Sequence, residues 1–87
     1  MCTYATQSIA MAGSAKGAAG WFNVSRATVY IDHPHHAGAE HTLNVDVIDP
    51  AAGPSARVAL ELTKDAARAL ARAINEALDG APAGLLH

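Results

Sequence analysis

The sequence predicts an α+β domain in which a four-stranded antiparallel sheet is covered on one face by a C-terminal helix. Two observations predict this fold: apolar residues alternate with polar ones through the middle of the chain, and a helical period follows near its end. With 87 residues, the chain is expected to form a single domain, residues 1–80, followed by a flexible C-terminal tail, residues 81–87.

Three segments have the two-residue period of strands with one buried side: residues 27–33, 41–49 and 56–62. The proline- and glycine-rich turn DPAAGP separates the last two. Residues 3–11 are expected to form a further strand, although their alternation is poor.

The glycine-rich segment GSAKGAAGWF, residues 13–22, is interpreted as a loop or wide hairpin connection, because glycine favours irregular backbone. Trp21 and Phe22 are expected to anchor its end in the core. A phosphate-binding loop is disfavoured, since Lys16 precedes Gly17 and no Ser or Thr follows in the required order.

The helix is expected to begin after Thr63, whose hydroxyl suits an N-cap, to run to about Leu78, and to be capped by Gly80. Apolar residues recur along it with a period of 3.6. This stripe, which should face the sheet, comprises Ala67, Leu70, Ala71, Ile74, Ala77 and Leu78.

Composition excludes several function classes. The formal net charge is −2 and the six Lys and Arg residues are scattered, so neither nucleic acid nor an acidic membrane is an expected partner. No apolar run approaches the roughly 20 residues of a membrane span, and the first residues lack the features of a signal peptide, so a cytoplasmic protein is expected. A single cysteine, Cys2, precludes an internal disulfide.

The segment IDHPHHAGAEH, residues 31–41, holds four of the five histidines. If the strands on either side form an antiparallel hairpin, the core pattern itself sets the register: Val29 lies opposite Val45, Ile31 opposite Leu43, and His33 opposite His41. The Cβ atoms of His33 and His41 would then be about 5 Å apart, close enough for both to bind one metal ion.

Between them lie three more donors: His35, His36 and Glu40. Imidazole is a good ligand for a divalent transition metal, here Zn, Fe, Cu or Ni, and the sequence does not choose among them. It also leaves open whether His35 or His36 points inward. The spacing of His33, His35 and Glu40 is similar to the first metal motif of the cupins, although the flanking glycines of that motif are replaced here by Ala27 and Val47.

Strand connectivity should bring further groups to this edge of the sheet. In an up-and-down sheet, Cys2, His33, His41 and the helix N-terminus at Thr63 share one edge. A helix N-terminus carries free amides and about half a positive charge, which favours an anionic ligand beside the metal. Cys2 is therefore a candidate accessory ligand, and an inert buried cysteine is the alternative.

The stretches MCTY, GSAKGAAGWF, DHPHHAGAEHTLN and GPSARVALEL resemble a family of small actinobacterial proteins of unknown function. The family segment has the form DHPxHxxAEHTLN. The resemblance implies His33, His36 and His41 as the preferred ligands and places His35 at a variable position. It implies no activity.

Two functions are consistent with these observations. The first is a small histidine-rich metal-binding protein, extending to a metalloenzyme that acts on a small anionic substrate, with Glu40 as a general base or an orienter of the ligands. The second is a non-enzymatic protein-interaction module without metal. A homodimer is expected in either case, with the polar face of the sheet meeting water or a second subunit. This face comprises Thr28, Tyr30, Asp32, Thr42, Asn44 and Asp46.

Overall fold

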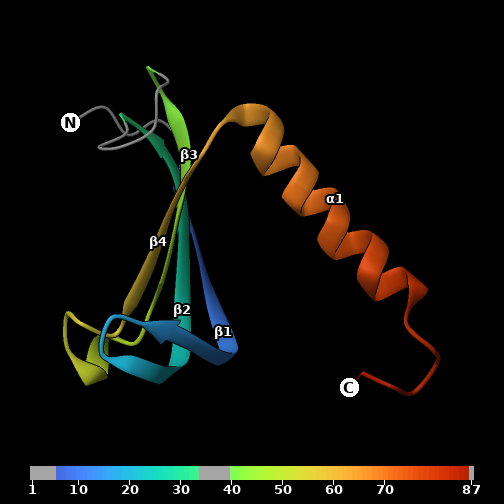
Figure 1. Ribbon diagram of the computed structural model, residues 1–87, viewed down its shortest axis with the longest axis horizontal. Helices are drawn as coiled ribbons and strands as arrows, with labels where there is room; N and C mark the ends of the chain where they lie inside the picture. Colours follow the sequence, from blue (N-terminus) through green and yellow to red (C-terminus); the bar gives the residue numbers. More distant parts are fainter. Residues whose placement is uncertain (1–5, 34–39, 87) are drawn as a thin grey trace.

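The computed structural model describes residues 6–33 and 40–86. It contains a four-stranded antiparallel sheet of order β1-β2-β3-β4 and one C-terminal helix, so the predicted fold class is confirmed (Figure 1). The elements are β1 (Thr6–Gly17), β2 (Gly20–Asp32), β3 (Thr42–Ile48), the short 3-10 helix η1 (Pro50–Ala52), β4 (Arg57–Leu62) and α1 (Lys64–Gly80).

The register between β2 and β3 is the one that the core pattern predicts: Val29 pairs with Val45, and Ile31 with Leu43. Strand β4 continues these rows across the sheet, because Leu62 pairs with Leu43 and Val58 with Val47. Apolar side chains therefore occupy one face of the sheet in consecutive rows, and the helix lies on this side. We call it the aliphatic face. It comprises Ile9, Ala27, Val29, Ile31, Leu43, Val45, Val47, Val58, Leu60 and Leu62.

The interpretation of the glycine-rich segment as a wide loop is wrong. Strands β1 and β2 are long and meet at a two-residue turn, with Gly17 paired to Gly20. The predicted strand over residues 3–11 is present from Thr6, but β1 continues to Gly17. The register shifts between Ala10 and Gly13, and such a bulge breaks the alternation that would have extended the prediction.

The end of the β1–β2 hairpin curls toward the start of β4. A Cβ atom at Gly17 would lie 3.3 Å from the carbonyl oxygen of Arg57 and 3.2 Å from the Phe22 ring, so this close approach favours glycine. Trp21, by contrast, is 71% exposed, and the expectation that it anchors the core is wrong. Its side chain lies at the end of a hairpin, where nothing in the described part of the chain covers it.

The polar face also differs from expectation. Thr42 and Asn44 are buried within the chain itself, and the Thr42 hydroxyl donates a 2.6 Å hydrogen bond to the Asn44 side-chain oxygen. Because each of these buried polar groups has a hydrogen-bond partner in the other, their burial carries a smaller desolvation penalty. These two positions therefore do not offer a surface to water or to a second subunit.

Helix α1 begins at the predicted N-cap, where the Thr63 hydroxyl accepts a hydrogen bond from the Ala66 amide at 3.2 Å. It extends through Gly80, two residues beyond the predicted end at Leu78, and its C-cap is Ala81 rather than Gly80. Only its first turns lie close to the sheet, and its C-terminal half diverges from the strands (Figure 1). Within the described residues, no helix is long and apolar enough to cross a membrane.

Candidate metal and ligand site

His33 and His41 lie next to each other at the open end of the β2–β3 pair. The last paired positions of the two strands are Asp32 and Thr42, so each histidine is the residue just beyond the ladder. Their ring centroids are 4.4 Å apart, with the ring planes tilted by 35°. The predicted cross-strand placement of the two histidines is confirmed.

Two hydrogen bonds fix His33. Its backbone amide donates to the Asp32 carboxylate at 2.7 Å, which holds the chain as it leaves β2. Its ring Nδ1 lies 3.1 Å from the carbonyl oxygen of Glu40. Because a carbonyl can only accept, this contact requires the proton on Nδ1 and leaves the lone pair on Nε2. Metal-binding histidines are commonly oriented by such a bond from the second ring nitrogen.

Glu40 thus orients the His33 ring through its backbone carbonyl, whereas the sequence suggests its carboxylate for that role. The residue itself is exposed. His41 is half-buried, with its Nε2 atom shielded from solvent. Of the two rings, His33 is therefore the more exposed and His41 the more enclosed.

The remaining predicted ligands, Cys2, His35 and His36, lie outside the described residues. Within residues 6–33 and 40–86, His, Cys, Asp and Glu side chains form no group of three or more that could hold a metal ion. The described part of the chain therefore contributes two imidazoles to the candidate centre.

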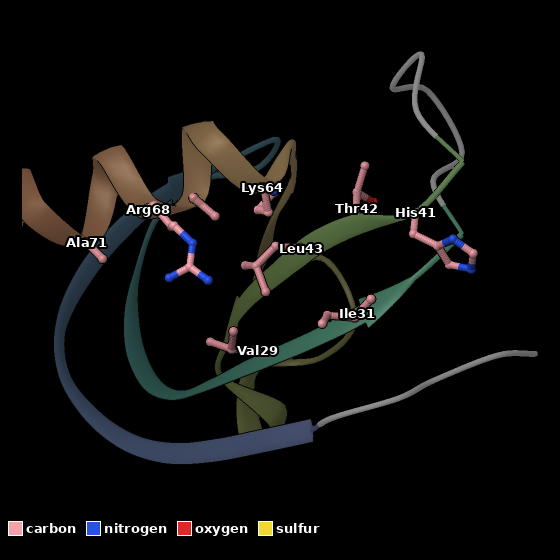
Figure 2. A pocket seen from close by; sticks show the side chains of 9 residues that line it. Val29, Ile31, His41, Thr42, Leu43, Lys64, Arg68 and Ala71 are labelled. Atoms are coloured by element: carbon pink, nitrogen blue, oxygen red, sulfur yellow. The ribbon is translucent and has the colours of Figure 1, made fainter.

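Next to His41, a groove of about 550 Å³ separates the sheet from the start of α1. Its floor is aliphatic, formed by Val29, Ile31 and Leu43, and its helix side carries Ala67 and Ala71 together with the cations Lys64 and Arg68. Figure 2 shows the Arg68 guanidinium directed from the helix toward the sheet, and His41 at one end of the groove. The small alanine side chains leave this space open.

The sequence reasoning placed the helix N-terminus beside His41 but missed the two cations. A signal was available: Lys64, Arg68 and Ala71 are spaced by four and three residues, so they fall on one side of the first helical turns. Their proximity to His41 follows from Leu62, which pairs with Leu43 at the end of β4.

A second polar cluster lies on the opposite face of the sheet, and the sequence reasoning missed it as well. Asp46 accepts a 3.0 Å hydrogen bond from the Tyr30 hydroxyl and forms a 2.8 Å ion pair with Arg57. Burial, followed by the bond to Asp46, raises the pKa of Tyr30, and the bond to Asp46 raises the pKa of Arg57. Asp46 thus provides a hydrogen-bond acceptor for Tyr30 and for Arg57, an arrangement that is typical of a structural network.

Fold and site together define a small α+β domain with a paired-histidine edge and a cation-lined aliphatic groove. Residues 1–87 match the model of a family described as "Family of unknown function (DUF6295)". The chain belongs to this family. No match was found among curated proteins or among solved structures.

Proposed function

We propose that this protein binds a divalent transition metal through His33 and His41, with a third imidazole from the histidine-rich segment between them. The observation that carries the proposal is the 4.4 Å spacing of the two rings, together with the Nδ1 bond that leaves Nε2 of His33 available. The family resemblance implies His36 as the third ligand, His35 is the alternative, and Cys2 is an accessory candidate.

Neutral imidazoles leave the charge of a bound divalent ion uncompensated, so such an ion would acidify water or attract an anion. Lys64 and Arg68 support an anionic ligand, because both cations line the groove that ends at His41. The aliphatic floor of the groove favours a ligand with an apolar body. The proposed substrate class is therefore a small organic anion, such as an aliphatic carboxylate, and Glu40 would serve as its general base.

The metal is tested on protein purified without an affinity tag, by elemental analysis and by calorimetric titration with zinc, nickel and copper salts. Wild-type protein should bind one equivalent, and His33→Ala or His41→Ala should abolish binding. His87→Ala is the matched control, because it removes a histidine from the C-terminal tail and should leave binding unchanged. A full complement of metal on His41→Ala protein would overturn the site, and so would a wild-type protein that binds none of the three ions.

The anion is tested separately, with octanoate as the probe and NMR chemical shifts as the readout. Arg68→Gln should weaken binding about 10- to 150-fold, since a charge-assisted hydrogen bond contributes about 1.5–3 kcal/mol. Arg26→Gln is the control, because Arg26 pairs with Ile48 of β3 and therefore lies on the face of the sheet opposite the groove. Equal affinities for the two variants would exclude the groove as the binding site.

The second candidate function, a protein-interaction module without metal, is favoured by a different observation. Large apolar side chains on the helix and the sheet are exposed, among them Ile74, Leu60 and Ile9. Such surfaces commonly mark protein–protein contacts. This function does not need the histidines, so the metal titration separates it from the first.

A further inference from the structure

The apolar stripe of α1 is exposed along its C-terminal half. Leu70 is 41% exposed, Ile74 52% and Leu78 55%, so exposure rises as the helix moves away from the sheet. An amphipathic helix in a soluble domain normally buries this stripe against the core. The sequence spacing is that of a buried helix face, yet the described residues do not cover it.

The aliphatic face of the sheet is likewise incompletely covered. Across one row, Leu60 of β4 pairs with Val45, which pairs with Val29 of β2. Leu60 is 41% exposed, and Ile9, paired with Ala27 in the next row, is 51% exposed. None of the described residues that make up the aliphatic face is charged, whereas a sheet face that meets solvent is normally polar.

The interior of the single chain is correspondingly small. Among the described residues, the buried apolar side chains are Val24, Ala27 and Ala56, two of which are alanines. The accessible surface of the chain is 6445 Å², whereas a compact monomer of 8.9 kDa exposes roughly 4,800 Å². The Cα radius of gyration, 14.4 Å, also exceeds the roughly 12 Å expected for this length.

We propose that the exposed helix stripe and the part of the aliphatic face outside the groove form the interface of a homodimer. In a two-fold symmetric pair, the stripe of each helix packs on the uncovered part of the partner's sheet, and the reverse contact is made at the same time. The excess surface is about 1,600 Å² per chain, or about 3,200 Å² for two chains, which is enough for the roughly 2,000–5,000 Å² that obligate homodimers bury.

A second copy fits better than an unrelated partner because each chain carries both halves of the contact. The helix offers long side chains at Leu70, Ile74 and Leu78, and the sheet offers flat rows of branched ones. The interface lies on the side opposite Tyr30 and Asp46, so it replaces the polar face as the expected subunit contact. This proposal goes beyond the metal site and does not depend on it.

The test is the mass of the full chain in solution, measured by light scattering during size-exclusion chromatography and by sedimentation equilibrium. Wild-type protein should have twice the 8.9 kDa chain mass, and its Tm should rise with protein concentration, because dissociation accompanies unfolding. Ile74→Asp should give a monomer or an unfolded chain, since a carboxylate cannot be buried unpaired in the interface.

Ala69→Asp is the matched control, because it adds the same charge to the same helix on the side away from the stripe. It should remain dimeric. If Ile74→Asp unfolds while Ala69→Asp does not, the proposal is supported, since Ile74 is already half exposed in the single chain. A folded wild-type monomer at high micromolar concentration, or a dimer that both variants retain, would overturn it.

Discussion

The ring of His33 is held beside that of His41 by a hydrogen bond from its Nδ1 to the Glu40 carbonyl at 3.1 Å, which crosses the base of the segment that joins the two strands. This bond fixes the tautomer of His33. We expect neutral His33 to carry its proton on Nδ1, and long-range ¹⁵N–¹H NMR spectra of metal-free protein report the tautomer directly. Finding the proton on Nε2 would rule out this geometry.

Glu40→Gln should leave metal affinity nearly unchanged. The backbone carbonyl of residue 40, and not its side chain, contacts His33, and the substitution preserves the backbone. Competition with a chromophoric zinc chelator measures the affinity. A loss of metal affinity of more than about tenfold would contradict this prediction, because it would place the carboxylate in contact with the ligands. If the protein has a catalytic activity, Glu40→Gln should lower its turnover about 10- to 100-fold.

Stability should decline at alkaline pH because of Tyr30. Burial and the bond to Asp46 raise the pKa of Tyr30 above its ordinary value of 10.0. The neutral hydroxyl therefore favours folding, an effect that is complete below the unfolded pKa and lost as pH rises through the folded one. Tyr30→Phe should flatten this decline in denaturant titrations. In a Tyr4→Phe background, tyrosinate absorbance should report ionisation of Tyr30 above the pKa of free tyrosine.

Asp46→Ala should destabilise the fold by about 1–3 kcal/mol, because it removes the acceptor of Tyr30 and the ion-pair partner of Arg57. For a domain of this size, each kcal/mol lowers Tm by about 4–8 °C. The control is Asp79→Ala in the last turn of α1, which should change stability by less than about 0.5 kcal/mol. Thermal melts at matched concentration compare the two, and equal Tm values would contradict the network.

Thr63→Ala should cost about 1 kcal/mol through loss of the helix N-cap, whereas Thr63→Ser should retain most of the stability. Circular dichroism melts measure both variants. Equal Tm values for Thr63→Ser and Thr63→Ala would mean that the hydrogen bond from the Ala66 amide to the hydroxyl does not stabilise helix α1.

Much of the fold was predictable because the sequence has the two-residue period of strands and the 3.6-residue period of a helix. In the segments that became β2, β3 and β4, apolar residues alternate. The simplest register that keeps Val29, Ile31, Leu43 and Val45 on the same face is the one observed. That register also places His33 beside His41. Thr63 and the apolar residues that follow it at helical spacing predict α1, because capping and periodicity are local properties.

The first hairpin was not predictable in this way. The bulge between Ala10 and Gly13 moves side chains from one face to the other, so β1 has no regular period to detect. Gly17 belongs to a strand because the hairpin curls onto the backbone of β4, a contact between residues far apart in the sequence.

Local pattern determined the apolar faces of β2, β3, β4 and α1, and which histidines meet across β2 and β3. Tertiary structure decided what covers those side chains. It buried Thr42 and Asn44, exposed Trp21, and left Ile74 and Leu60 outside the core of the single chain. Periodicity identifies an amphipathic face, but burial depends on distant segments and on partner surfaces, which no local pattern contains.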